Sequence, residues 1–145
     1  MRSFTGKEFG RVLIMHLGKG ELFLENVQSE IDRLGIKNGI LVSCIGSLRK
    51  AVLHIITTTE DTSTDQIITL EDPIEVSAVQ GLILNGEPHF HLVISDTHRA
   101  YTGHLENGCE VQYLIELAII ELADLELARE KDRFGINHIV DMKNK

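Results

Sequence analysis

Apolar residues are clearly spaced as in a helix near the start of the chain. Between residues 21 and 34, Leu24, Val27 and Ile31 recur every three or four positions. This spacing places them on one face of an amphipathic helix. Gly35 follows the last apolar position, and glycine is the usual residue of a left-handed helix C-cap. The pattern therefore predicts one principal helix at residues 21–34.

The other apolar runs are short, rich in β-branched residues and bounded by Gly, Pro, Asn or Asp, which predicts strands. We expect strands at 11–17, 40–45, 51–58, 67–70, 74–84 and 89–95. Residues 46–50 are predicted to turn between two of these strands, and the polar residues 59–65 to form an exposed loop. The strand, helix, strand order at the start of the chain predicts that the first two strands are parallel.

A longer apolar segment at 109–122 has a periodicity compatible with either a helix or a strand. We predict a strand, because the elements before it are strands. Residues 125–130 and 136–140 are predicted to pair as a terminal hairpin around the Arg133-Phe134-Gly135 turn. The chain therefore ends in strands, with no second long helix expected.

These elements define an α+β fold class with one principal helix on a twisted, mainly antiparallel sheet. The 145 residues, 43% of them apolar, are enough for one domain with its own core. We predict a single domain over residues 1–145. Its core is expected at about 10–122, and residues 123–145 are expected to be a hairpin extension.

Two histidines of the predicted strand 89–95 lie on one face. His89 and His91 are two positions apart, so their side chains leave the strand on the same side, about 7 Å apart at their bases. Polar residues then allow a turn. If that turn is centred on the 97–98 bond, with a two- or four-residue loop, His104 lies opposite His91 on the same face. A three- or five-residue loop would send His104 to the other face.

Three imidazoles that face one point can bind a divalent ion and leave a fourth position open, as in catalytic zinc sites. We therefore predict that His89, His91 and His104 bind zinc or another divalent metal. The alternative is that these histidines line a solvated face or form hydrogen bonds with neighbours. The other histidines lack partners at ligand spacing, and we predict structural or exposed positions for His16, His54, His98 and His138.

Two strand carboxylates, Glu75 and Glu110, are candidates for a catalytic general base or for a group that orients a ligand histidine. We expect one of them within hydrogen-bonding distance of a ligand histidine or of the open position. The alternative, a solvated strand carboxylate, is the commoner case. Arg49 is expected to hold its turn, and the alternative is that it binds an anionic substrate. Cys44 and Cys109 lie in apolar surroundings and are predicted to be buried.

The overall charge disfavours nucleic acid as a partner. With a net charge of −8, the chain is repelled by nucleic acid unless its basic residues gather on one face. The chain has no apolar run of about 18 residues, so we predict no membrane span. Its first seven residues lack the apolar core of a signal peptide, which leaves the cytoplasm as the expected compartment.

Several motifs resemble those of one family. They are Gly20-Glu21-Leu22, Ile45-Gly46-Ser47-Leu48, Ile74-Glu75-Val76 with Gly81, Pro88-His89-Phe90-His91, Ser95-Asp96, and Gly103-His104-Leu105 with Gly108. Together they span about residues 10–122, and the chain resembles the PPC (plants and prokaryotes conserved) domain family. Thr102 stands where the family usually has a second glycine, which would alter the bend of this strand without removing a ligand.

The resemblance implies a homotrimer, and the long apolar segment 111–122 favours assembly as well. It also implies a DNA-binding label, taken from plant members that carry a basic Arg-Gly-Arg-Pro segment not found in these 145 residues. Several prokaryotic members resemble metal proteins through the three histidines. The fold further resembles acetolactate decarboxylase, in which an H-x-H motif and a later histidine bind zinc.

The expected function follows from the residues and the resemblance together. We expect a cytoplasmic homotrimer with a three-histidine metal site, which binds a small anionic ligand or a regulatory partner. DNA binding is expected to be weak. The alternative is a metal-dependent lyase or hydrolase that acts on a small oxyanion-bearing metabolite.

Overall fold

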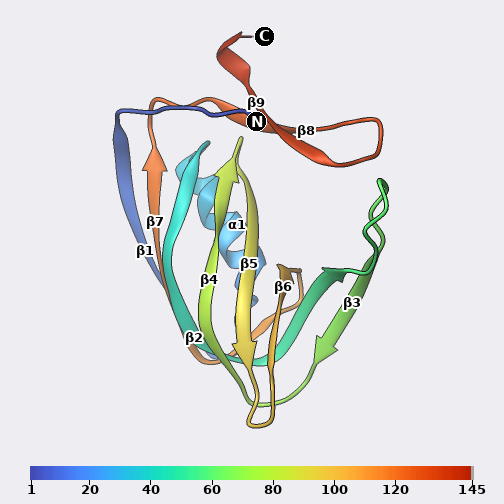
Figure 1. Cartoon of the computed structure of the whole chain (residues 1–145). Helices are drawn as coiled ribbons and strands as arrows, with labels where there is room; N and C mark the ends of the chain where they lie inside the picture. Colours follow the sequence, from blue (N-terminus) through green and yellow to red (C-terminus); the bar gives the residue numbers. More distant parts are fainter. Residues whose placement is uncertain (145) are drawn as a thin grey trace.

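One helix packs against a seven-stranded sheet (Figure 1). The computed structural model describes residues 1–144. The first elements are β1 (Phe9–Gly18), α1 (Phe23–Leu34), β2 (Gly39–Ile56), β3 (Asp65–Leu70) and β4 (Ile74–Leu84). The later ones are β5 (Glu87–Ser95), β6 (Ala100–Leu105), β7 (Glu110–Leu122), β8 (Leu127–Lys131), β9 (Asn137–Asp141) and a short 3-10 helix, Met142–Asn144. The predicted α+β class, the strand at 109–122 and the terminal hairpin are confirmed.

The helix ends where the sequence predicts. Gly35 has φ 66°, the left-handed conformation that glycine adopts without a steric penalty. Its N–H donates to Asp32 O, and the N–H of Ile36 donates to Ile31 O. This is a Schellman C-cap, which satisfies carbonyl groups that the helix end would otherwise leave unpaired. Phe23, Val27 and Ile31 are fully buried against the sheet, whereas Leu24, the first residue of the predicted apolar stripe, is only partly buried.

The main sheet closes on itself through the long strand β2. The first part of β2 lies between β4 and β7, and its last part pairs with β3 and β6. Because β4 also pairs with β5, and β5 with β6, the strands β2, β4, β5 and β6 form a closed ring. Strand β1 pairs antiparallel with β7 at the free edge. β1 and β2 are parallel to each other, as predicted, with β7 between them.

The predicted turn at residues 46–50 is wrong, because β2 runs through it without a break. Gly46 has φ 151° and marks a close approach between strands. A Cβ atom at this position would lie only 2.2 Å from Leu114 O of β7. The glycine therefore lets β7 follow β2 through an irregular register, and β2 extends to the edge of the histidine hairpin.

The core determines which face of β5 carries the histidines. Phe90, Leu92 and Ile94 are almost completely buried and belong to the core cluster that includes the helix. Alternation along the strand sends His89 and His91 to the opposite face. A register slip by one residue would bury the imidazoles and expose the apolar residues, so core packing maintains the orientation of the histidines.

The β8–β9 hairpin is a separate two-stranded sheet that lies across one end of the main sheet (Figure 1). It is tied to the rest of the molecule by Asn38, whose side chain donates to Leu125 O and accepts from the N–H of Leu127. Asn38 is almost fully buried, so these bonds satisfy a polar group that would be costly to bury alone. Among the described residues, no helix is both long and apolar enough to cross a membrane.

Candidate metal centre

The β5–β6 hairpin brings the three histidines together. The loop between the strands has four residues, 96–99, and His91 lies directly opposite His104, as the symmetric hairpin predicts. Asp96 shapes the loop, because its Oδ1 accepts the N–H groups of His98 at 2.6 Å and Arg99 at 2.8 Å. This is the usual way in which an aspartate stabilises a turn.

The three imidazoles converge closely enough for one ion. Nε2 of His89 lies 3.2 Å from Nε2 of His91. The ring of His104 stands perpendicular to both, with centroids 4.7 Å from that of His89 and 5.3 Å from that of His91. One nitrogen from each ring falls within 4.8 Å of the others. Two nitrogens bound tetrahedrally to zinc at about 2.0–2.1 Å are roughly 3.3 Å apart, which is close to the spacing of the His89 and His91 nitrogens.

The surroundings keep these imidazoles neutral at pH 7. Burial lowers the pKa of His89 to about 4, assisted by the charges of His104 and Arg129. Burial also lowers the pKa of His91 and His104 from their ordinary value. A neutral imidazole has a free lone pair, and a metal must otherwise displace a proton to bind. The three side chains are therefore in the protonation state that a metal ligand requires.

Two further residues lie beside the cluster, and they correct the prediction that His54 has no partner at ligand spacing. His54 on β2 is directly opposite His104 on β6, and their rings stack with centroids 4.5 Å apart. Nδ1 of His54 lies 2.5 Å from Oε1 of Glu106. His54, His104 and Glu106 form a second group whose ligand atoms lie within 4.8 Å of one another. His54, His104 and His91 are therefore cross-strand neighbours in one row across β2, β6 and β5.

A cleft of about 310 Å³ opens beside His89 and His91. Its other lining residues are Gly81, Leu82, Arg129, Asn137 and Ile139. The Arg129 guanidinium, from β8, donates to the carbonyl oxygens of Glu87 and Leu82, both at 3.0 Å. These bonds hold the terminal hairpin over the β4–β5 turn, so the hairpin forms one wall of the cleft.

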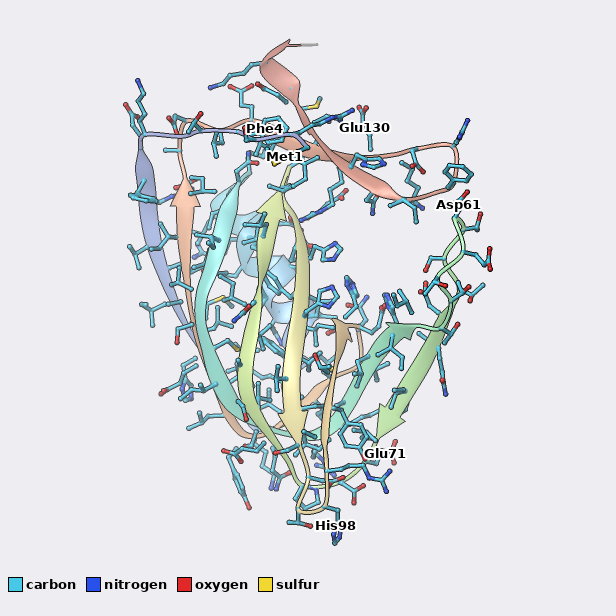
Figure 2. The ribbon with its side chains drawn as sticks, viewed as in Figure 1. Met1, Phe4, Asp61, Glu71, His98 and Glu130 are labelled. Atoms are coloured by element: carbon cyan, nitrogen blue, oxygen red, sulfur yellow. The ribbon has the colours of Figure 1, made fainter. Side chains whose placement is uncertain are left out.

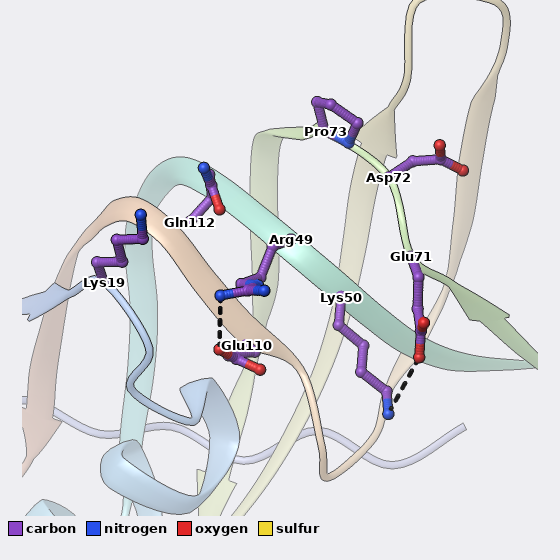
Figure 3. A pocket seen from close by; sticks show the side chains of 8 residues that line it. All are labelled: Lys19, Arg49, Lys50, Glu71, Asp72, Pro73, Glu110 and Gln112. Carbon is purple, nitrogen blue, oxygen red and sulfur yellow. Dashed lines mark ion pairs between the residues drawn. The ribbon is translucent and has the colours of Figure 1, made fainter.

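Neither of the predicted catalytic carboxylates belongs to the histidine groups found in residues 1–144. Glu110 lies in another pocket, of about 620 Å³, with its Oε1 3.5 Å from Nη1 of Arg49 (Figure 3). Glu75 is an exposed residue of β4, between the paired positions Ser47 and Ser95. A catalytic role for either residue stays a prediction, and the carboxylate that accompanies the histidines is Glu106.

The fold and this cluster define an α+β protein with three histidines on the solvent-facing side of a closed, twisted sheet. The chain belongs to the Plants and Prokaryotes Conserved (PCC) domain family, whose model matches residues 4–123. This is the family that the sequence resembles under the abbreviation PPC. The β8–β9 hairpin, including Arg129, lies beyond the matched residues.

Solved structures share this fold. A metal-containing protein from Archaeoglobus fulgidus has a TM-score of 0.82 and 21% identity, with 97% of this chain and 100% of that chain covered. A candidate DNA-binding protein from Bacteroides thetaiotaomicron has a TM-score of 0.78 and 18% identity, covering 94% and 96%. A Staphylococcus aureus protein similar to α-acetolactate decarboxylase is more distant, with a TM-score of 0.53, 15% identity, and 79% and 52% covered.

The chain also matches a short part of a much longer protein. The Bifunctional protein GlmU of Synechococcus sp. strain JA-3-3Ab is 26% identical over 113 residues. That alignment covers 74% of this chain and 17% of the Synechococcus protein. The chain therefore spans about a sixth of the length of the curated relatives it matches.

Proposed function

We propose that the protein binds one divalent metal ion through His89, His91 and His104, with zinc as the expected ion. The observation that carries this proposal is the convergence of three neutral imidazoles from two paired strands, with ligand atoms within 4.8 Å of one another. An all-nitrogen set of this kind suits zinc, which imidazole binds well. A metal-containing protein from Archaeoglobus fulgidus has the same fold, which gives further support.

We infer that the bound ion serves to bind a small ligand in the adjoining cleft. Structural zinc sites are usually closed by four protein ligands, whereas three ligands leave a position for another molecule. The cleft lies next to His89 and His91, so a ligand seated there is within reach of that position. A divalent ion supplies Lewis acidity, which polarises an oxygen atom of the ligand.

Zinc uptake tests this proposal. The protein is stripped with a chelator, incubated with excess zinc, desalted and analysed for zinc and protein content. We expect one zinc ion per chain for the wild type and none for the variant with His89, His91 and His104 all replaced by alanine. Equal zinc content in the two proteins would contradict a three-histidine site.

A second candidate function is that of a metal-dependent lyase or hydrolase. The observation that favours it is the short contact between Glu106 and His54, whose ring stacks on His104. A carboxylate–histidine pair beside a metal ligand can orient that ligand or exchange a proton with a bound molecule. This function would require turnover that depends on both the metal and the Glu106 carboxylate.

We propose further that the protein assembles as a homotrimer. The supporting feature is a set of exposed apolar side chains on β1 and β2, the two strands that flank β7, an unusual feature for a monomer. It includes Val12, Ile14 and Ile45, and a shallow groove joins Ile14 and Ile45 across β7. The expected number of three subunits comes from the family resemblance.

The assembly is tested by placing a charge in this apolar surface. Ile14 is 71% exposed, and Ile14→Asp is expected to convert the trimer to monomers, because a carboxylate cannot be buried without a partner. Light scattering at micromolar concentration measures the mass. Ile56→Asp is a matched control, since Ile56 is 69% exposed at the far end of β2. A monomeric wild type, or a trimeric Ile14→Asp variant, would contradict the proposed interface.

DNA binding has weaker support. Some structural relatives are candidate DNA-binding proteins. However, the adjacent basic residues Arg49 and Lys50 share their pocket with three carboxylates, and ion pairs at 3.5 Å join Arg49 to Glu110 and Lys50 to Glu71 (Figure 3). With the net charge of −8, these pairs leave little positive field at this surface. We propose that any DNA contact is weak and salt-sensitive.

A further inference from the structure

The terminal hairpin supplies three residues to the cleft beside the histidines. Arg129 belongs to β8, and Asn137 and Ile139 belong to β9. The family model ends at residue 123, before this hairpin begins. The histidines therefore belong to the shared domain, whereas the facing wall is built by residues outside the match. Ligand selectivity of this chain would then depend on the hairpin.

Arg129 is the charged group of this wall. Two of its N–H groups bind the backbone carbonyls of Leu82 and Glu87, and an arginine has five N–H donors in all. No ion pair to Arg129 is found among residues 1–144. The side chain is partly buried and lines the same cleft as His89 and His91; burial lowers its pKa, and the nearby charge of Glu87 raises it. A partly buried cation that has no carboxylate in ion-pair contact favours an anionic ligand.

The rest of the cleft determines the kind of anion. Leu82 and Ile139 present apolar surface, and Asn137 carries an amide. A volume of about 310 Å³ suits a small molecule. A planar guanidinium matches a carboxylate through parallel hydrogen bonds. A short carbon chain attached to that carboxylate would contact the two apolar side chains.

We propose that the cleft binds a small carboxylate, with its anionic group between the histidine cluster and Arg129 and its carbon chain against Leu82 and Ile139. This inference rests on the proposed metal site. It adds a ligand class and assigns Arg129 the role of selecting it. Inorganic phosphate, another small oxyanion, lacks the apolar part and should bind more weakly.

The test uses cobalt-loaded protein, because the visible spectrum of cobalt reports changes at the metal without any assay of activity. Butyrate is added to the wild type and to Arg129→Gln. Loss of a charge-assisted contact is expected to weaken butyrate binding roughly 10- to 100-fold. Arg133→Gln is the matched control, because Arg133 lies in the same hairpin with its guanidinium over the Phe134 ring. It should bind butyrate as the wild type does.

Arg129 also anchors the hairpin, so a second variant separates binding from folding. Asn137→Asp leaves both Arg129 hydrogen bonds in place but adds a negative charge to the same wall, and should also weaken butyrate binding. Unchanged butyrate affinity in both variants, or phosphate binding as tight as butyrate, would overturn the inference. Cobalt uptake is measured separately. A protein that takes up no cobalt contradicts the metal site and the inference, whereas a loaded protein that is insensitive to both substitutions contradicts the inference alone.

Discussion

Replacing His91 with alanine is expected to weaken zinc binding by more than about 100-fold. Loss of a residue that only orients a metal ligand usually weakens metal binding by about 10- to 100-fold, so loss of a ligand itself should exceed that range. His91 is in contact with both other histidines of the cluster, since its Nε2 lies 3.2 Å from that of His89 and it is directly opposite His104. Without it, two imidazoles remain, and protein zinc sites use at least three protein ligands. Competition with a chromophoric chelator measures the dissociation constant.

His98→Ala is the matched control for this prediction. His98 lies at the tip of the β5–β6 turn, at the opposite end of the sheet from the β8–β9 hairpin (Figure 2). Its backbone N–H, which the substitution retains, makes the bond to Asp96. We expect wild-type zinc affinity for this variant. Similar affinities for the His91 and His98 variants would show that zinc binds elsewhere.

Gly103→Ala is expected to destabilise the fold by about 3 kcal/mol, which is at the upper end of the usual cost of overpacking. The same substitution is expected to abolish tight zinc binding. A Cβ atom at this position would lie 2.5 Å from His54 O and 2.8 Å from Cδ1 of Leu53. The first of these contacts is with backbone, which cannot rotate away. Strand β6 must therefore move from β2, and His104 moves with it.

Gly18→Ala provides the comparison for this effect. A Cβ atom at Gly18 would meet only the Glu21 carboxylate, at the ordinary contact distance of 3.6 Å. Both variants are unfolded in urea, and zinc affinity is measured in parallel. We expect a large loss of stability and of zinc binding for Gly103→Ala alone. Equal stability of the two variants would contradict the close β2–β6 approach.

The sequence was sufficient to predict the histidine hairpin because its geometry is local. Alternation along β5 gives the shared face of His89 and His91, and the buried Phe90 and Leu92 maintain it. The parity of a four-residue loop then places His104. The helix and its glycine cap were predictable for the same reason, since the apolar spacing and the cap lie within a few residues of each other.

The surroundings of the hairpin could not be predicted, because they depend on contacts between distant segments. Gly46 is followed by Ser47, and such a Gly-Ser pair is typical of turns. Only the close approach of β7 explains why Gly46 lies within a continuous strand. The position of His54 depends on the closure of β2 onto β6. Glu106 carried one usable signal, its spacing of two residues from His104. Arg129 carried none, because the docking of the hairpin brings it to the cleft.

The most direct test of the central claim is a crystal structure of the zinc-loaded protein with anomalous diffraction recorded at the zinc edge. We expect one anomalous peak per chain, at about 2.0–2.1 Å from a nitrogen of each of His89, His91 and His104. The remaining coordination position should face the cleft that contains Arg129. A peak bound by other residues, or an ion enclosed by four protein ligands, would contradict an open three-histidine metal site.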